Sequence, residues 1–314
     1  MVTTSMESSN VTIGSSRTIG SVLDEVHRRF LEANLFYGHG TDNAWDEACM
    51  LVLFVAKLPP NSGRECVDLP LQEEQLATIA SLASRRIDDR VPLAYLIGRS
   101  WFMGVEFIAD ERALVPRSPF AELVANDFQP WWRPPAAPRV LDLCCGGGCI
   151  GISAALTSDN TEVVLSDIDQ RALSLAQDNI SLHGVDDRVT CLRSDLFSAF
   201  TAQRFDLILS NPPYVDAQDL AAMPAEYQAE PAIALGAGAD GLDIARRILR
   251  DAHHFLTEEG VLFLELGNSW QALDRELSDY PLAWADFSEG GHGILVLEKN
   301  TLERVSAYYN APLS

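Results

Sequence analysis

The chain has 314 residues, of which 47% are hydrophobic and 22% charged, as in folded globular proteins. Its formal net charge of −22 argues against a protein that grips nucleic acid stably through the phosphates, and it favours a basic partner. The length exceeds that at which a single hydrophobic core usually stops growing, so we expect two domains. No apolar stretch approaches the length that crosses a bilayer, so no membrane association is expected.

The first sixteen residues are rich in Ser, Thr and Gly and lack the apolar segment of a signal peptide. We expect residues 1–16 to form a disordered leader and the protein to be cytoplasmic. The six cysteines agree with a reducing compartment, because Cys144, Cys145 and Cys149 crowd one loop while the others are scattered. No paired CxxC motifs occur, and no metal site is expected.

Three amphipathic helices are predicted in the N-terminal part of the chain. Apolar residues recur at helical spacing over residues 17–37 and again over 71–87, after Pro70. Between these segments, Asp42 is expected to cap a second helix that runs through Lys57. Together the helices predict a small helical domain over residues 17–98, and we assign substrate recognition to it.

Residues 99–138 are predicted to form a hairpin followed by a linker. Aromatic and β-branched residues surround Gly104 within residues 101–108, which is typical of two short strands. A helix is expected to begin near Pro119, because proline is favoured in a first helical turn. Residues 130–138 contain four prolines and form the clearest linker, where Trp131 and Trp132 are expected to pack at a domain seam.

From residue 139 to 314, short apolar runs alternate with helical segments. Buried parallel strands are predicted at residues 140–143, 162–166, 205–210 and 261–266, and helices at 170–182 and 242–256. Segments 282–287 and 293–298 are predicted to form an antiparallel hairpin. The predicted fold class is therefore α/β, with a Rossmann-like, mostly parallel sheet and an antiparallel edge.

A glycine-rich turn follows the first of these strands, which contains Asp142. A strand, a glycine turn and a helix together bring backbone N–H groups against a ligand. The spacing Gly146-x-Gly148-x-x-Gly151 also matches the dinucleotide fingerprint, although an ordinary turn fits the same pattern. The predicted cofactor-binding residues here are Asp142, Cys144, Cys145, Gly146, Gly147 and Gly148.

Two carboxylates at later strand ends extend this half-site. Asp167 lies roughly 20 residues past the loop, where such folds place a ribose-binding acid. Capping of the next helix, together with Asp169, is the alternative for Asp167. Asp195 is expected to meet an adenine amine while Leu196 covers the ring, and a surface turn is the alternative for these two residues. The loop and Asp167 together favour an adenosine-type ligand.

The strand at 205–210 runs directly into Asn211-Pro212-Pro213-Tyr214. Two prolines fix an extended turn at the carboxyl edge of the sheet, where ligands bind in such folds. The side-chain oxygen of Asn211 and the carbonyl oxygen of Pro212 are then fixed acceptors, which match the two donors of a planar NH₂ group.

A planar amide nitrogen is a poor nucleophile because its lone pair is delocalised. Acceptors for both hydrogens raise the electron density on nitrogen and align it with the methyl carbon of a sulfonium. Tyr214 is expected to cover the flat target and to lie near the positive sulfur. We therefore predict that Asn211, Pro212 and Tyr214 are catalytic.

The order of these motifs resembles class I methyltransferases that act on planar amino groups, and the chain after the leader is similar to HemK-type protein-glutamine methyltransferases. The segment Leu114-Val-Pro-Arg-Ser-Pro-Phe-Ala-Glu-Leu123 resembles the branch that modifies ribosomal protein L-three (PrmB). Residues 227–235 and 239–249 resemble the same branch. The release-factor branch (PrmC) usually has Pro-Arg-Pro-x-Thr-Glu instead.

This resemblance implies S-adenosylmethionine as the cofactor, bound by residues 144–148 and Asp167, with Asn211 also on the cofactor side. It implies a glutamine-binding turn at Asn211, Pro212, Pro213 and Tyr214, and a basic ribosomal protein as the substrate. Cys145 and Gly147 stand where many relatives have Thr and Ser, and Leu196 stands where the release-factor branch often has Trp.

Four other functions remain open from the sequence. They are the same chemistry on a peptide-chain release factor, adenine methylation of DNA, hydride transfer with a nicotinamide cofactor, and ribosome assembly without catalysis. The pair Ser118 and Pro119 disfavours the release factor, and the acidic charge disfavours DNA. Hydride transfer with a nicotinamide cofactor would leave the turn at 211–214 without a function.

Overall fold

The computed structural model describes residues 17–288 and 290–311, so the predicted leader lies outside the described residues. By its internal contacts the chain divides into two compact units. The first comprises the residues up to Leu35 together with Thr41–Asp89, and the second comprises Phe36–Gly40 and the residues from Arg90 onward. Within the described ranges, the structure has no helix with the length and apolarity that a bilayer crossing requires.

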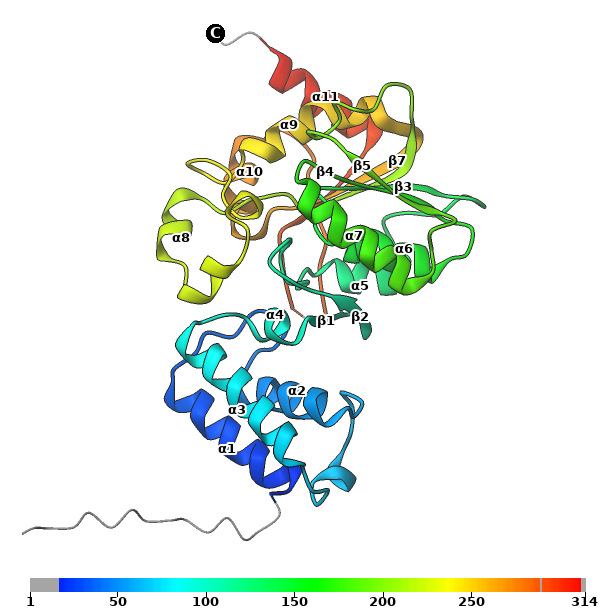
Figure 1. The fold of residues 1–314 in the computed structure, drawn as a ribbon. Coiled ribbons are helices and arrows are strands. Elements are labelled where there is room, and N and C mark those ends of the chain that lie inside the picture. The colour runs from blue at the N-terminus through cyan, green and yellow to red at the C-terminus, as the bar shows by residue number, and fades with distance from the viewer. Residues whose placement is uncertain (1–16, 289, 312–314) are drawn as a thin grey trace, which may run out of the picture. The chain divides into compact units, whose positions relative to one another are not determined.

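The first unit is helical, as the spacing of apolar residues predicts. Thr18 begins the first helix with a capping box, in which its hydroxyl accepts a hydrogen bond from the Ser21 N–H. The second helix is capped by Asn43 instead of the predicted Asp42, because the Asn43 side chain accepts from the Asp46 N–H. The elements are α1 (Ile19–Glu32), α2 (Ala44–Ala56), the 3₁₀ helix η1 (Arg64–Cys66) and α3 (Glu73–Asp88) (Figure 1).

The second unit is built on a seven-stranded sheet of order β5-β4-β3-β6-β7-β9-β8. The neighbours from β5 to β7 pair in parallel, whereas β9 pairs antiparallel with both β7 and β8. The predicted α/β class, with a mostly parallel sheet and an antiparallel edge hairpin, is therefore confirmed. The strands are β3 (Arg139–Leu143), β4 (Glu162–Asp167), β5 (Val189–Arg193), β6 (Phe205–Ser210), β7 (Leu256–Glu265), β8 (Ala283–Trp284) and β9 (Ile294–Glu298).

The predicted N-terminal hairpin also forms. Its strands β1 (Arg99–Phe102) and β2 (Val105–Ile108) pair antiparallel in a small sheet of their own. The helix α4 (Leu93–Ile97) precedes them and α5 (Phe120–Ala125) follows them. Trp132, from the proline-rich segment, is buried in the second unit and packs edge-on against Phe128, with ring centroids 5.9 Å apart.

Helices cover both faces of the large sheet (Figure 1). Successive residues of β3 point to opposite faces of the sheet. Val140 packs into the core under α5, α6 (Cys149–Thr157) and α7 (Gln170–His183). Leu141 packs into the core under α9 (Asp243–Asp251), α10 (Trp270–Glu276) and α11 (Lys299–Asn310). This alternation is the period of two that a strand imposes on its side chains.

The connection from β6 to β7 differs from the prediction. The helix expected over 242–256 ends at Asp251, because the chain tightens into the 3₁₀ helix η4 (Ala252–Phe255) and enters β7 at Leu256, before the predicted start at 261. The same connection contains α8 (Ala217–Ala222) and two 3₁₀ helices, η2 (Ala225–Ala229) and η3 (Ala232–Ala234). A further 3₁₀ helix, η5 (Gly267–Ser269), follows β7.

The strand order reverses between β3 and β6, which are neighbours in the sheet although β4 and β5 separate them in the chain. Leu143 and Ser210 are register partners, so both strands end at the same level. The Ser210 hydroxyl donates to the Leu143 carbonyl oxygen at 2.7 Å. In open parallel sheets such a reversal opens a crevice at the carboxyl ends, where ligands bind.

Gly151 lies where α6 packs tightly against the sheet. A Cβ at this position would lie 2.4 Å from Cδ2 of Leu165 and 2.9 Å from Cβ of Asp142. We predict that Gly151→Ala lowers the free energy of unfolding by about 2–3 kcal/mol, because helix and sheet must move apart. Unfolding in urea measures this loss.

The matched control is Gly184→Ala at the end of α7. A Cβ there meets open space, so the variant should lose only about 1 kcal/mol from its left-handed backbone, which has φ of 63°. Equal losses in the two variants would contradict the packing explanation.

Candidate active site

A cavity of about 660 Å³ lies at the carboxyl edge of the sheet, a volume usual for small-molecule sites. Its wall brings together the glycine turn after β3, the acid that ends β4 and the proline turn after β6. The predicted site residues on this wall are Cys144, Cys145, Gly146, Gly147, Asp167, Asn211, Pro212, Pro213 and Tyr214. Their roles stay predictions, but the structure places them around one space.

The glycine turn has the backbone shape of a ligand cradle. Cys144, Gly146 and Gly148 have positive φ values of 63°, 54° and 81°. Glycine adopts this left-handed backbone conformation without strain, but a residue that carries a Cβ, such as Cys144, is destabilised there by roughly 1–2 kcal/mol. A Cβ at Gly146 would meet only Ala113, at 3.6 Å, so glycine leaves the space above the turn open for a ligand.

Asp167 ties the glycine turn to the end of β4. Its Oδ2 accepts from the Gly146 N–H at 3.0 Å, and its Oδ1 accepts from the Asp169 N–H at 2.9 Å. Burial raises the pKa of Asp167, while these two N–H groups act in the opposite direction. A carboxylate has about four lone-pair sites, so Asp167 keeps acceptor capacity for hydroxyl groups in the cavity. The cap of α7 is Asp169, which accepts from the Arg171 N–H at 2.8 Å.

Asp142 and Gly148 lie behind the turn and not on the cavity wall. Asp142 is fully buried, and its Oδ2 accepts from the Gly151 N–H at 2.8 Å. Its Oδ1 has no hydrogen-bond partner among the described residues, and burial raises the pKa of Asp142 to about 7. Gly148 caps α6. Both residues therefore support the predicted cofactor loop from within the fold.

The structure does not bring Asp195 and Leu196 to the cavity wall. The Asp195 carboxylate turns toward α9, where it accepts from Arg247 Nη2 at 2.8 Å. Leu196 has φ of 49° and is buried in the core on the α9 side of the sheet. Their contact with adenine stays a prediction, since Asp195 is half exposed beside Arg247 and Leu196 packs in the core. Ile168, next to Asp167, is an exposed apolar residue that does line the cavity.

Three contacts fix Tyr214 in the proline turn. Its hydroxyl donates to Glu265 Oε1 at 3.1 Å, and its carbonyl oxygen accepts from the Ser269 hydroxyl at 2.7 Å. A Cβ at Gly267 would lie 2.5 Å from Cε2 of the Tyr214 ring, so the ring rests against bare glycine backbone. The turn is therefore restrained at its backbone, its ring and its hydroxyl.

Asn179 on α7 holds the glycine turn and the hairpin together, and our sequence reasoning missed it. Its Nδ2 donates to the Gly147 carbonyl oxygen at 3.0 Å and to the Ile108 carbonyl oxygen at 3.3 Å. Its Oδ1 accepts from the Ile108 N–H at 2.7 Å. The sequence signal that could have identified Asn179 is its place among the apolar, core-facing positions of an amphipathic helix.

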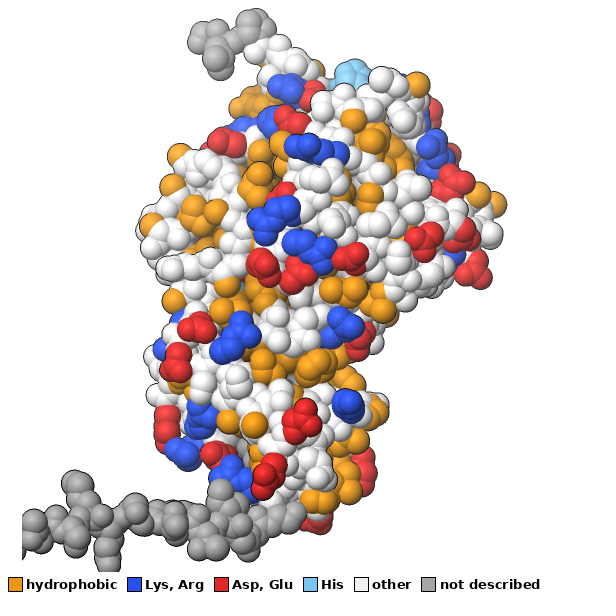
Figure 2. Space-filling view, in the orientation of Figure 1, with side chains coloured by type: hydrophobic (Ala, Val, Ile, Leu, Met, Phe, Trp, Pro, Cys, Tyr) orange, Lys and Arg blue, Asp and Glu red, His pale blue; other side chains and the backbone are white. Residues whose placement is uncertain are grey.

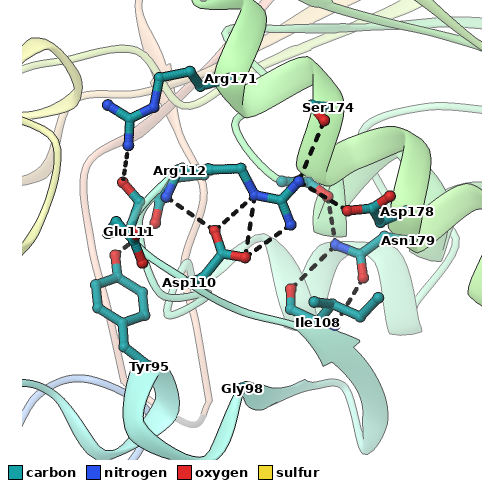
Figure 3. A network of polar contacts seen from close by, with 12 residues as sticks. Tyr95, Gly98, Ile108, Asp110, Glu111, Arg112, Arg171, Ser174, Asp178 and Asn179 are labelled. Atoms are coloured by element: carbon teal, nitrogen blue, oxygen red, sulfur yellow. Dashed lines mark hydrogen bonds and ion pairs between the residues drawn. The ribbon is translucent and has the colours of Figure 1, made fainter.

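Figure 3 shows how the segment after β2, from which Arg112 lines the cavity, is bound to α7. Arg112 donates to Asp110 from Nε and Nη2 at 2.8 and 2.7 Å, and its Nη1 lies 2.8 Å from Asp178. Arg171 donates to the Glu111 carbonyl oxygen at 3.2 Å. These bonds hold the segment after β2 against the helix that follows Asp167.

An ion pair between Arg117, which lines the cavity, and the buried Glu230 also escaped the sequence analysis. Arg117 donates to the two oxygens of Glu230 at 2.5 and 2.7 Å, and Glu230 also accepts from the Val115 N–H at 3.1 Å. Nε2 of His39 lies 3.6 Å from Glu230. Burial alone would raise the pKa of Glu230, but His39 and Arg117 outweigh it and lower this pKa to about 2. The guanidinium lies 5.3 Å over the Tyr227 ring.

All six cysteines are free, including the three near the glycine turn. Burial raises the pKa of the Cys144, Cys145 and Cys149 thiols, so none of them is an activated nucleophile. Within residues 17–288 and 290–311 there is no group of three or more His, Cys, Asp or Glu arranged to hold a metal ion.

We predict that Glu230→Gln lowers the free energy of unfolding by about 3 kcal/mol at pH 7, because Arg117 loses its buried counter-charge. The pKa of Glu230 is lowered on folding from 4.5 to about 2. Its stabilising contribution is therefore complete above about pH 4.5 and lost as the pH falls toward 2. Denaturant unfolding across this range should show the wild type and the variant converging at low pH. A constant difference would argue against the ion pair as its source.

Comparison with known proteins agrees with this geometry. The model of the Methyltransferase small domain family matches residues 122–227. The chain is 44% identical to the ribosomal protein uL3 glutamine methyltransferase of Francisella tularensis over 86% of each chain. It is 44% identical to the protein of the same name from Xanthomonas campestris, over 89% of this chain and 90% of that one.

Among solved structures, a methyltransferase from Pyrococcus furiosus matches with a TM-score of 0.44 and 16% identity, over 72% of this chain and 98% of that chain. The two curated relatives carry the assignment, because their identity extends over most of both chains. The protein belongs to the ribosomal protein uL3 glutamine methyltransferase family, and it is a methyltransferase whose methyl donor is S-adenosylmethionine.

Proposed function

We propose that this protein methylates the side-chain amide nitrogen of a glutamine in ribosomal protein uL3, the L-three protein of the sequence analysis. The observation that carries the proposal is the single cavity that joins the glycine turn and Asp167 to the turn at residues 211–214. The substrate is supported by the two relatives, which are named for uL3 and match over most of the chain.

The residues at the glycine end of the cavity fit an adenosine-type methyl donor. Gly146 leaves the space above its turn free, and the Asp167 carboxylate has acceptor sites left for ribose hydroxyls. S-adenosylmethionine, when bound, supplies a methyl group activated by a positively charged sulfur. The Tyr214 ring lines the same cavity and offers a π face to positive charge.

The residues at the proline end fit a planar amide. The side-chain oxygen of Asn211 and the carbonyl oxygen of Pro212 accept one hydrogen each from the target NH₂ group, which orients the nitrogen and raises its electron density. As the methyl carbon exchanged its bond to sulfur for one to nitrogen, the positive charge would pass from sulfur to nitrogen, where both acceptors would stabilise it. A methylated amide nitrogen that still carries two hydrogens is strongly acidic, so one proton leaves without a strong base.

We also propose that the enzyme acts in the cytoplasm on a basic protein partner. The net charge of −22 would attract such a partner. On the face shown in Figure 2, the Lys and Arg side chains are interspersed with Asp and Glu, without the continuous basic surface that phosphate binding uses. This charge distribution favours uL3 over DNA as the substrate.

We predict that Asn211→Ala lowers kcat for uL3 methylation at least about 100-fold, because one of two acceptors for the target amide is lost. The affinity for S-adenosylmethionine should change less than about threefold. Transfer of labelled methyl to purified uL3 and calorimetric titration measure the two effects. Asn310→Ala, at the end of α11 and outside the cavity wall, is the matched control with normal turnover expected.

The substrate arm of this experiment separates the alternatives. Equal labelling of uL3 in which the target glutamine is replaced by alanine would refute glutamine methylation. Labelling of a release factor in preference to uL3, or of DNA, would replace the proposed substrate.

Asp167→Ala should act on the other half of the site. We expect its Kd for S-adenosylmethionine to rise at least about tenfold, because ribose hydroxyls lose a charged acceptor. At saturating donor, kcat should fall much less than in Asn211→Ala. Calorimetry with wild type and variant tests this, and tight binding of NAD in place of S-adenosylmethionine would contradict the proposed donor.

A further inference from the structure

A buried carboxylate lies directly behind the tyrosine of the proline turn. Glu265 is the last residue of β7, is 3% exposed and lines the cavity. Its Oε1 accepts from the Tyr214 hydroxyl at 3.1 Å, and its Oε2 accepts from the Ser118 hydroxyl at 2.5 Å. Glu265 belongs neither to the glycine turn nor to the acceptors for the target amide.

The carboxylate occupies a position where an apolar residue would favour stability. Its neighbours Phe263, Leu264 and Leu266 are fully buried, and burying a carboxylate without a bonded cation is costly. Among the described residues Glu265 forms no salt bridge, and burial raises its pKa to about 7, against the effect of the two hydroxyls and Arg117. A buried group that opposes folding in this way is typical of functional sites.

Glu265 controls the part of Tyr214 that the other restraints leave free. The Ser269 hydroxyl fixes the Tyr214 backbone, and Gly267 supports one side of the ring. Among residues 17–288 and 290–311, Glu265 is the one that bonds to the Tyr214 hydroxyl, and this bond restrains the tilt of the ring. The carboxylate is itself held by Ser118, whose hydroxyl also accepts from the Phe120 N–H at 3.1 Å where α5 begins.

We propose that Glu265 is a positioning residue that holds the Tyr214 ring against the target amide during methyl transfer. The inference rests on the proposed function, which gives Tyr214 the task of covering the glutamine side chain. Glu265 acts through Tyr214, so its contribution to turnover exists only while the tyrosine hydroxyl is present.

A double-mutant cycle tests this dependence. Glu265→Ala and Tyr214→Phe should each lower kcat for uL3 methylation about tenfold, because a ring out of place leaves the amide poorly aligned. The affinity for S-adenosylmethionine should change less than about threefold in both. The double variant should be no slower than the slower single variant, since both changes remove the same bond. Glu265→Gln, which keeps an acceptor oxygen for the hydroxyl, should restore kcat to within about threefold of wild type.

A matched control removes a carboxylate elsewhere in the same unit. Glu276 on α10 bonds to Arg246 at 2.5 Å and does not line the cavity, so Glu276→Ala should keep a normal kcat. If Glu265→Ala does not fold, as judged by donor binding, Glu265→Asp takes its place. That variant keeps the charge but withdraws the acceptor by one carbon, so it should lose kcat in the same way.

Three results would overturn the inference. The first is a double variant whose loss is the product of the two single losses. The second is a donor affinity that weakens as much as kcat falls, and the third is a glutamine variant as slow as the alanine or aspartate variant. If the wild-type enzyme leaves uL3 unlabelled, the proposed function fails first, and this outcome is distinct from the other three.

Discussion

The parallel pairing of β3 with β6 is the constraint on which the site depends. Because Leu143 and Ser210 are register partners, the glycine turn and the proline turn leave the sheet at the same level and side by side. A slip of one residue in this pairing would turn the side chains of one strand to the opposite face and separate the two turns. Backbone hydrogen bonds in the sheet thus set the geometry between the half-site for the methyl donor and the half-site for the target amide.

Buried polar groups hold each half-site from behind. Asp142 bonds to the first turns of α6, and Asn179 bonds to the glycine turn. Glu265 and Ser269 both bond to Tyr214. The pKa of Asp142 and that of Glu265 are both raised to about 7 by burial, so both carboxylates reduce stability in return for fixed geometry. The walls of the cavity are therefore preorganised by the fold before any ligand arrives.

The parts of the site that the sequence predicted are local motifs at strand ends. The glycine turn, Asp167 and the turn at Asn211 each follow a recognisable apolar strand, and parallel strands bring such ends to one edge. Asp195 also follows a strand, as its sequence position indicates, but its contact with adenine stays a prediction because its side chain pairs with Arg247 and does not line the cavity. The Arg117–Glu230 pair joins residues 113 positions apart, so no local pattern indicates it.

The segment Phe36–Gly40 determines where the chain can be cut to make fragments or chimeras. It belongs to the unit that contains the cavity, although the chain before and after it belongs to the helical unit. Phe36 lines the cavity and its N–H donates to Glu226 at 3.0 Å, while the His39 ring lies 4.6 Å from that of Tyr227. A fragment that starts at residue 90 would consequently lack part of the pocket wall. A chimera that exchanges residues 17–89 as one segment would also exchange Phe36 and His39, so such an exchange has to leave Phe36–Gly40 in place to keep the pocket intact.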